Sequence, residues 1–449
     1  MTSRGMTTTG VEGIPLYREG GTDDESSERL EADRAGFMVR AYRQAGPIFR
    51  TWLDGKLWVV MAGLEANDFV WRNTALWDYP IVFPAFGEQM GPDHLNVLEG
   101  EAHRHKRTIL KPAFDQAPAM RYLSEFNLCF HRALAGAQGR GPVDLVEFWA
   151  EAITRANTET VARAEISDPA LKRLVRWERE MLAGIQLGEA RHAYYGRQEY
   201  VRLRAEAMDL MGGIVDERLA DPGRCDDNFS AVLLARSRQE GGYPDRSCLI
   251  DDLYYILVAG VENTSRLINW TALYCQFAPE WLGRLRAELD SWDGREASAL
   301  GGMACLKAVI METQRLRPPA FFVPRHAAQD FEFAGQRVPA GTNILNAHAV
   351  GHYLEEVYAD PFSFRPERFL ASGRFAPRAN GFFGGGVHLC LGRNYTLMQT
   401  PVALAQMFKY HDFDYRDRAA LQTALASPGP TIPPELWAEI KARGSRVDS

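Results

Sequence analysis

A glycine-rich loop near the C-terminal end of the chain carries one cysteine in the surroundings that a reactive thiolate needs. The loop runs from Phe383 to Gly392 with the sequence FGGGVHLCLG, and a helical pattern over residues 393–407 follows it. Backbone N–H groups and a helix N-terminus stabilise the negative charge of a thiolate, and glycines let the backbone pass close to a flat macrocycle. Cys390 is therefore our candidate ligand for an iron atom held in such a macrocycle.

The alternative interpretation is that Cys390 is one more small buried residue in an ordinary loop. Against it, Phe stands seven residues before the cysteine, Gly four before, a basic residue two before and Gly two after. This spacing resembles the cysteine loop of the cytochrome P450 family. The resemblance implies a haem b cofactor (iron protoporphyrin IX) with Cys390 as its metal ligand. It also implies cofactor contacts from Phe383, Gly384, His388 and Gly392.

A run of small and polar residues interrupts a long apolar helical pattern that predicts one helix over residues 247–277. The run reads AGVENTS over residues 259–265. Small residues leave room for a flat cofactor and a diatomic ligand, and an acid beside hydrogen-bonding groups can relay protons. The run resembles the oxygen-activation motif of the same family. The resemblance assigns catalytic roles to Glu262, Asn263 and Thr264, and cofactor contacts to Ala259 and Gly260.

The residue after the acid departs from the family pattern, which usually has threonine there. This chain has Asn263, with Thr264 one position later. An amide donates and accepts hydrogen bonds but cannot pass on a proton as a hydroxyl does. Three alternatives stay open: Asn263 with a water replaces the hydroxyl, the substrate helps, or the reaction is not simple hydroxylation. A fourth is that Asn263 only bonds to backbone at a helix kink.

Two basic residues one helical turn apart predict an anion-binding pair. His103 and Arg107 lie in the sequence GEAHRHKR over residues 100–107, on an expected helix, so both side chains project the same way. Taken alone, they are more typical of a solvated helix face. The family resemblance makes their ligand a haem propionate, with Arg325 and His388 as further cationic partners.

Glu312 and Arg315 stand three residues apart on one face of an expected helix over residues 303–317. Alone, they would be an ordinary surface ion pair. Together with the sequence FRPERF over residues 364–369, they resemble the family's Glu-x-x-Arg motif and the arginine that completes its buried triad. The resemblance implies that Glu312, Arg315 and Arg368 are structural and lock the core beneath the cysteine loop.

Two aromatic segments, residues 79–86 and 320–323, occupy positions that line pockets in the family. We therefore expect a substrate pocket for an apolar or aromatic ligand, although core packing is an equal alternative for each residue. The expected pocket residues are Phe83, Phe86, Phe321 and Phe322. Terpenoid, polyketide, aromatic amino-acid derivative, fatty acid and carrier-protein-bound substrates all remain possible.

The rest of the chain predicts a mainly α fold with small β-sheets, the cytochrome P450 fold, with a long central helix over a haem held by the cysteine loop. Strands are expected over residues 47–52 and 56–61, joined by a turn at Asp54-Gly55, and again within residues 330–345. A polar composition predicts a flexible segment over residues 1–29. Residues 30–449 are expected to form a single haem domain.

Charge and hydropathy exclude several classes of protein. The net charge of -7 gives no electrostatic reason to bind nucleic acid, and we expect no membrane anchor or secretory signal, hence a cytoplasmic protein. The six cysteines are scattered, which predicts reduced thiols. One basic cluster is a candidate docking surface for an acidic protein. It consists of Arg104, His105, Lys106, Arg107 and Lys111, with Arg393 added.

The resemblance implies a monooxygenase that uses O2 to hydroxylate or otherwise oxidise a hydrophobic small molecule, in secondary metabolism. NAD(P)H-derived electrons are expected from a separate ferredoxin or flavodoxin-type donor with its reductase. One alternative is an atypical reaction of the same family, namely oxidative coupling, ring formation or nitration, suggested by Asn263. The other is a haem-thiolate sensor without turnover, against which the retained acid Glu262 argues.

Overall fold

The computed structural model describes residues 10–53, 55–221, 227–379, 381–426 and 435–444. These residues form two compact units. The first unit comprises residues 10–82, 311–390 and 419–426, and the second comprises residues 83–310, 391–418 and 435–444. Across the described residues, no helix combines the length and the apolar character that crossing a membrane requires. The predicted mainly α architecture with small sheets is confirmed.

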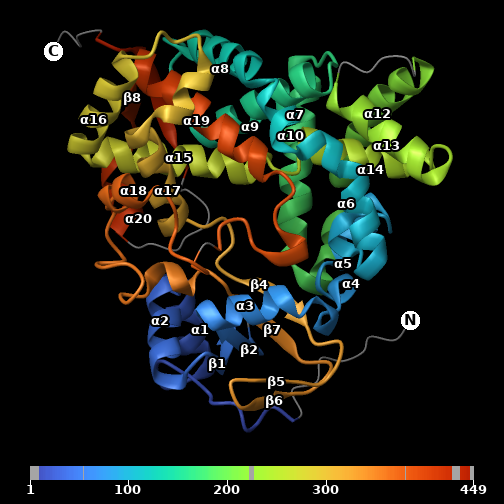
Figure 1. Cartoon of the computed structure of the whole chain (residues 1–449), viewed down its shortest axis with the longest axis vertical. Coiled ribbons are helices and arrows are strands. Elements are labelled where there is room, and N and C mark those ends of the chain that lie inside the picture. Colours follow the sequence, from blue (N-terminus) through green and yellow to red (C-terminus); the bar gives the residue numbers. More distant parts are fainter. Residues whose placement is uncertain (1–9, 54, 222–226, 380, 427–434, 445–449) are drawn as a thin grey trace. The chain divides into compact units, whose positions relative to one another are not determined.

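The first unit is built on a four-stranded sheet in the order β1-β2-β7-β4 (Figure 1). The strands are β1 (Ile48–Leu53), β2 (Lys56–Ala62), β7 (Asn343–Ala347) and β4 (Val323–His326). β1 and β2 are antiparallel, with Ile48 opposite Met61 and Leu53 opposite Lys56. β7 lies parallel to β2 and antiparallel to β4. A separate antiparallel pair joins β5 (Phe331–Phe333) to β6 (Gln336–Val338).

The predicted hairpin is present as β1 and β2, and its turn residue Asp54 lies outside the described residues. Gly55 has φ +66°, a left-handed conformation that glycine adopts without steric cost. Helices α2 (Arg34–Ala45) and α3 (Leu64–Arg72) flank the two strands in sequence. The other elements of this unit are α4 (Tyr79–Val82), η1 (Thr74–Leu76), η6 (Val350–Tyr353), α18 (Glu367–Ser372) and η7 (Gly386–His388).

Flexibility was predicted for residues 1–29, and this stays a prediction; residues 1–9 lie outside the described residues, and residues 10–29 make several contacts with the first unit. Val11 and Ile14 are buried in the core of the first unit. The N–H of Tyr17 donates to the carbonyl of Arg50 in β1 at 2.8 Å. Helix α1 (Asp23–Ala32) then begins at Thr22, whose hydroxyl accepts from the N–H of Glu25. A few apolar residues among many polar ones thus contact the core of the first unit.

The second unit is mostly helical and includes a three-stranded sheet in the order β3-β9-β8. Its strands are β3 (Pro142–Asp144), β9 (Trp437–Ala442) and β8 (His411–Tyr415). Its helices are α5 (Pro84–Met90), η2 (Leu95–Val97), α6 (Gly100–Phe114), α7 (Gln116–Met120), α8 (Leu123–Ala137), α9 (Leu145–Ala156), η3 (Asn157–Val161), α10 (Asp168–Ile185), η4 (Gly188–Ala190), α11 (Arg191–Tyr195), α12 (Gln198–Ala220), α13 (Asn228–Glu240), α14 (Arg246–Leu257), α15 (Val261–Phe277), α16 (Pro279–Asp290), η5 (Ala297–Gly302) and α19 (Arg393–Tyr410). Helices α17 (Ala304–Leu316) and α20 (Arg418–Ala426) have residues in both units.

The single helix predicted over residues 247–277 was wrong, because α14 ends at Leu257 and α15 begins at Val261. In the break, the N–H groups of Val258 and Ala259 both donate to the carbonyl of Tyr254, at 3.0 and 3.2 Å. The N–H of Val261 then donates to Val258 at 2.9 Å rather than four residues back. An Ala-Gly pair offers little side-chain packing to hold a regular turn, and glycine is a poor helix former. The apolar pattern of the sequence continues across the break, so the pattern does not indicate that the helix is interrupted.

A side chain from another helix stabilises this break. Asn157 donates from Nδ2 to the carbonyl of Leu257 at 3.0 Å, and its Oδ1 accepts from Nε2 of Gln399 in α19 at 2.7 Å. Helix ends leave carbonyl groups without partners inside the helix, and burying such groups unpaired is costly. Asn157 therefore satisfies a carbonyl that the interruption leaves unpaired at the C-terminus of α14.

In the first unit, Glu312, Arg315 and Arg368 meet in a buried ionic cluster. Arg315 donates to both carboxylate oxygens of Glu312, from Nε at 2.9 Å and from Nη2 at 2.7 Å, and neither side chain is exposed. Arg368 Nε donates to the same carboxylate at 3.2 Å. Arg315 also donates to the carbonyls of His352 and Pro361, at 2.8 and 2.5 Å. The cluster thus ties α17 to the segment that leads toward the cysteine loop.

We expect Glu312→Gln to reduce the free energy of unfolding by about 3–5 kcal/mol, because it leaves two guanidinium groups without their counter-charge. The matched control is Glu367→Gln, which weakens an ion pair with Arg365 in which both side chains are almost half exposed. The control should change stability by less than about 1 kcal/mol. Urea unfolding followed by circular dichroism measures both. Similar small losses in the two variants would show that the buried cluster contributes no more than a surface pair.

Candidate active site

The cysteine loop folds back on itself around Cys390. The N–H of Cys390 donates to the carbonyl of Phe383 at 2.9 Å, and the N–H of Leu389 donates to Gly386 at 3.2 Å. The Cys390 thiol is exposed. Phe383 lies edge-on against Phe382, with ring centroids 4.7 Å apart. A closed loop that leaves its cysteine accessible has the form that a thiolate ligand requires.

The glycines of this loop are needed for different structural reasons. Gly384 and Gly386 have φ of +66° and +63°, which other residues rarely adopt. A Cβ on Gly386 would lie 2.4 Å from the backbone oxygen of Trp71, and one on Gly385 would lie 2.3 Å from the Trp71 ring. A Cβ on Gly392 would meet no atom of the described chain within 4 Å. The first three glycines are therefore explained by the packing of the chain itself, whereas Gly392 is not.

In the first unit, Tyr79 brings His388 and Arg325 together. The ring of His388 stacks on Tyr79 with centroids 4.0 Å apart, and the Arg325 guanidinium lies 5.1 Å from the centre of the same ring. Arg325 is buried and donates to the carbonyl of Pro324 at 2.7 Å. Burial lowers the pKa of its guanidinium, and no ion pair with a carboxylate is found for it among the described residues.

This arrangement fits an anionic group. A buried cation is normally paired, and a guanidinium is suited to binding a carboxylate through two hydrogen bonds. The donors at Arg325, together with the accessible thiol of Cys390, match the carboxylates and the iron of a haem. The first unit thus supplies the chemistry that the proposed cofactor needs.

In the second unit, His103 and Arg107 lie one turn apart on α6 as predicted. His103 is buried and Arg107 is half-buried. Burial, with Arg107 and Arg104 adding to it, lowers the pKa of His103 to about 4. The imidazole is therefore neutral near pH 7 and offers hydrogen bonds rather than charge, so Arg107 carries the positive charge of the pair.

Glu262 sits at the start of α15 and is held by two arginines. Arg179, on α10, donates from Nε to Glu262 Oε1 at 2.5 Å, and Arg266 lies 3.5 Å from Oε2. The carboxylate is only 8% exposed, whereas the Arg179 side chain is 29% exposed. Sequence reasoning missed Arg179, because a contact across 83 residues leaves no local spacing to detect.

The two candidates after the acid have different surroundings. Asn263 is exposed in the first turn of α15, and of the two residues at the end of the break before this helix, Gly260 is also exposed and Ala259 is half-buried. Thr264 is buried, and its hydroxyl lies 3.1 Å from the hydroxyl of Thr396 in α19. The later threonine is thus engaged within the protein, and Asn263 is the exposed polar side chain.

The four predicted pocket aromatics fall into two pairs. Phe83 and Phe86, in the second unit, contact each other edge-on with centroids 6.3 Å apart. Phe321 and Phe322, in the first unit, lie 5.1 Å apart. Phe321 is 1% exposed and stacks on Tyr353, so it packs in the core, which was the alternative interpretation. The other three are half-buried and keep accessible ring surface.

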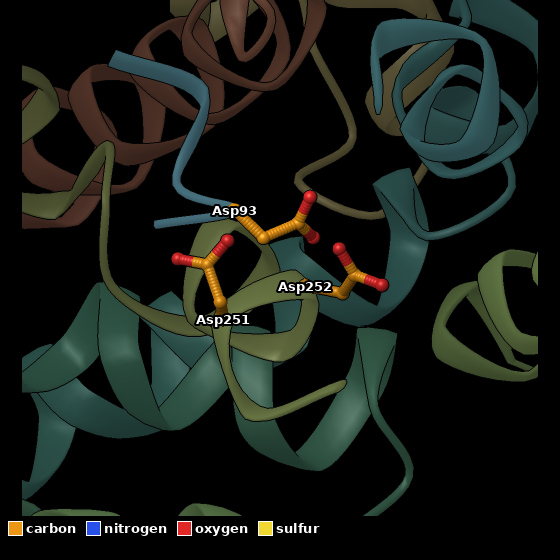
Figure 2. Close-up of side chains that lie close together, drawn as sticks. All are labelled: Asp93, Asp251 and Asp252. Carbon is orange, nitrogen blue, oxygen red and sulfur yellow. The ribbon is translucent and has the colours of Figure 1, made fainter. Parts of the chain in front are cut away.

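Three aspartates form a cluster that sequence reasoning did not single out (Figure 2). One oxygen each from Asp93, Asp251 and Asp252 lies within 4.8 Å of the others, close enough for a metal ion. The ammonium of Lys106 instead lies 2.8, 2.9 and 2.6 Å from these three carboxylates. Burial alone would lower the pKa of Lys106, but the carboxylates outweigh it and raise that pKa. Arg236 adds a second cation at 2.7 Å from Asp93 and Asp252.

The cluster is therefore an ion-pair network in which two cations already contact the three carboxylates, and this occupancy does not favour a metal. It also corrects the predicted basic docking surface, since Lys106 is 1% exposed and cannot contact a partner. The sequence of a basic run does not show whether a given lysine points outward to solvent or inward to the core. Arg104, His105 and Lys111 remain exposed.

His352 connects the ionic cluster of Glu312 to the cysteine loop. Its Nδ1 lies 2.9 Å from the carbonyl of Arg315, and its Nε2 accepts from the N–H of Gly381 at 3.1 Å. These contacts assign the proton to Nδ1 and leave Nε2 as the acceptor. Burial, followed by Arg315 and His348, lowers the pKa of His352 to about 3. His352 is therefore neutral in the folded protein at any physiological pH.

The family comparison agrees with this site. The family model described as Cytochrome P450 matches residues 28–436. A putative cytochrome P450 139 of Mycobacterium tuberculosis is 25% identical over 384 residues, which cover 82% of this chain and 89% of the relative. A sterol 14alpha-demethylase of Mycolicibacterium vanbaalenii is 24% identical over 426 residues, covering 90% of this chain and 92% of the relative.

A solved structure described as retinoic acid-bound cyanobacterial CYP120A1 has the same fold, with a TM-score of 0.75 and 22% sequence identity. The match covers 92% of this chain and 96% of that chain. The protein belongs to the cytochrome P450 family. Membership confirms the predicted family and fold, and it supports haem-thiolate monooxygenase activity in general, with haem as cofactor and O2 as oxidant. The roles of the individual site residues stay predictions.

The buried histidines predict a loss of stability in mild acid. In the unfolded chain a histidine binds a proton near its ordinary pKa of 6.5, whereas His352 resists protonation until about pH 3. Between these values the unfolded state binds more protons, so the free energy of unfolding falls as pH falls, by up to about 1.4 kcal/mol per pH unit for this group. His348, whose pKa burial lowers to about 4, adds to the effect.

Urea unfolding between about pH 7 and about pH 5 measures this slope. His352→Gln keeps a donor and an acceptor but does not titrate, so its slope should be shallower by up to one proton. A variant with the slope of the native protein would show that His352 does not carry the acid sensitivity.

Proposed function

We propose that this protein binds haem b through Cys390 and oxidises a hydrophobic small molecule with O2, receiving electrons from a separate donor. The observation that carries the proposal is the closed loop from Phe383 to Gly392, which holds Cys390 exposed with its N–H bonded to Phe383. Bound there, the haem would supply the iron centre that binds and activates O2. Phe383 would shield the sulfur from water, which tunes the electron density that a thiolate donates.

The cationic side chains would hold the haem carboxylates. Arg325 offers a buried guanidinium supported by Tyr79, and Arg107 offers the charge of the α6 pair, with His103 and His388 as hydrogen-bonding partners. Each contact of this kind compensates a negative charge in surroundings of low dielectric, where an unpaired charge is expensive.

Glu262 would carry protons to the reacting oxygen. As it stands, its carboxylate is neutralised by Arg179 and Arg266, so it must exchange one of these contacts before it can take up and deliver a proton. Asn263, exposed in the first turn of α15, would orient the last hydrogen bond in the relay. Thr264 is engaged with Thr396 and would act only on the packing of α15 against α19.

The substrate is proposed to be apolar. Phe83, Phe86 and Phe322 keep accessible ring surface, which suits an apolar or aromatic ligand. One relative is described as acting on a sterol and one structural neighbour as binding retinoic acid, and both of these ligands are largely hydrocarbon. We propose oxidation in secondary metabolism, in the cytoplasm, with a ferredoxin or flavodoxin-type donor. Exposed basic residues such as Arg104, Lys111 and Arg393 would attract and orient that electron donor.

An atypical oxidation is the second candidate, and the exposure of Asn263 favours it. Asn263 is exposed, whereas the hydroxyl of Thr264 faces Thr396. The exposed amide can form hydrogen bonds, but no hydroxyl is placed beside it to pass on a proton. Oxidative coupling, ring formation or nitration would then replace simple hydroxylation. Product analysis with isotopically labelled O2 separates the two, because hydroxylation adds one labelled oxygen atom.

We expect Cys390→Ala to abolish the strongly red-shifted Soret band that a reduced haem-thiolate protein gives with carbon monoxide, together with all oxygenase activity. Cys248→Ala, at another partly exposed free cysteine, should keep both. Absorption spectra of the purified variants, normalised to haem content, make the measurement. A normal band in Cys390→Ala would show that another residue binds the iron.

Asn263→Thr restores a hydroxyl at the position after the acid. If the reaction is hydroxylation, product formed per NAD(P)H consumed should rise by about twofold or more, because a hydroxyl passes protons that an amide cannot. Thr264→Val is the control, and it should leave this ratio unchanged because its hydroxyl faces Thr396. Loss of product would instead assign the amide to an atypical reaction. An unchanged ratio would remove Asn263 from the mechanism.

A further inference from the structure

Helix α10 buries an acid where its pattern calls for an apolar residue. The buried face of the helix includes Leu171, Leu174, Val175 and Met181, and Glu178 falls in the same stripe at helical spacing. Glu178 is 1% exposed. An ionised carboxylate in such a position is costly unless it is paired. A residue of this kind needs an explanation beyond packing.

Glu178 has no pairing that would keep it ionised. Among the residues that the structure describes, neither of its carboxylate oxygens has a hydrogen-bond partner. The ionisable groups that act on it are Arg179 on its own helix, Glu262 and Arg266 on α15, and Tyr254 on α14. Burial, followed by the negative charge of Glu262, raises the pKa of Glu178 well above its usual range, and the two arginines only partly oppose this.

Glu262 is the opposite member of the pair. Its two oxygens lie 2.5 Å from Arg179 and 3.5 Å from Arg266, so both oxygens contact a cationic side chain, unlike those of Glu178. Two neighbouring carboxyl groups whose surroundings differ in this way divide naturally into an acid and a base. The arginines form the link, because both guanidinium groups act on both carboxyl groups.

We propose that Glu178 and Glu262 form a carboxyl pair holding one proton, and that Glu178 stores this proton and passes it to Glu262. The role of Glu262 in the chemistry rests on the proposed function. Because no described atom bonds to the Glu178 oxygens, one water molecule must bridge the two groups. In the transfer, the O–H bond of Glu178 breaks as its proton passes to this water, a proton of the water passes to a carboxylate oxygen of Glu262, and no electrons are exchanged. Glu178 becomes a carboxylate until a proton from solvent restores it. Glu178 is thus a positioning residue that acts through Glu262.

The same arginines that hold Glu262 would stabilise the transfer. When Glu262 takes the proton, its attraction for Arg179 and Arg266 falls, while the new charge on Glu178 attracts them. The positive charge therefore needs to shift only within one small cluster of side chains. Arg179 is 29% exposed, so one side of the cluster reaches solvent.

The first test is infrared spectroscopy of the haem-loaded protein near neutral pH, taken as the difference between spectra in H2O and in D2O. The native protein should show the carbonyl stretch of a protonated carboxyl group, shifted in D2O, and Glu178→Gln should lack it. Glu262→Gln is the matched control and should keep the band with an altered frequency, because it removes the charged neighbour. Absence of the band from the native protein, or its persistence in Glu178→Gln, would overturn the proposal. This readout needs neither substrate nor turnover, so it stands even if the proposed reaction is wrong.

The second test asks whether the stored proton is used. With surrogate redox partners and NAD(P)H, product per electron in Glu178→Gln should fall at least about tenfold, with electrons diverted to hydrogen peroxide and a changed solvent isotope effect. Glu178→Asp keeps an acidic proton and should restore part of the yield. The carbon monoxide spectrum confirms that each variant is folded and loaded. Native coupling in a folded Glu178→Gln would overturn the transfer step, whereas loss of activity in every variant and in the native protein would point to failure of the proposed function.

Discussion

The interaction on which the first unit depends is the two-pronged hydrogen bonding between Arg315 and Glu312. Both side chains are fully buried, so water contributes nothing to their solvation and each must be satisfied by the protein. Arg315 also donates hydrogen bonds to the carbonyls of His352, Pro361 and Ser363. A charged pair in the interior thereby fixes the backbone from η6 through the irregular segment that contains Pro361 and Ser363. The cysteine loop follows that stretch, and His352 transmits the constraint to Gly381.

In the second unit the corresponding constraint is the break between α14 and α15. It allows Glu262 to lie in the first turn of a new helix, where the unpaired N–H groups favour a carboxylate. Asn157 bonds to Leu257 across the break, and Gln399 bonds to Asn157 in turn. The acid, the amide of Asn263 and the arginines around them are therefore placed by polar contacts made far from them in the sequence. Regular helix formation alone would not have produced this arrangement.

Local patterns predicted much of this protein, and long-range contacts account for the rest. The loop around Cys390 and the three-residue spacing of Glu312 and Arg315 are readable because neighbouring residues carry the whole signal. Arg179 and Glu178 escaped prediction, since a charged residue in an amphipathic helix does not reveal which distant acid it will face. The continuous helix over residues 247–277 was wrongly predicted because side-chain periodicity says nothing about which carbonyl each N–H will choose. Lys106 was misjudged for the related reason that a basic run does not show which of its members turns inward.

Lys106 carries a further implication for how this protein is assembled. Three carboxylates that converge from a loop and from α14 would ordinarily repel one another, and many proteins meet that problem with a bound divalent ion. Here the counter-ion is covalently part of the chain. The junction of α6, α13 and α14 is consequently insensitive to the concentration of free metal and to chelators, and it forms as soon as the helices dock. Its weakness is of another kind, because any modification that neutralised this one amine would deprive Asp251 of its ammonium partner and leave Asp93 and Asp252 to Arg236 alone.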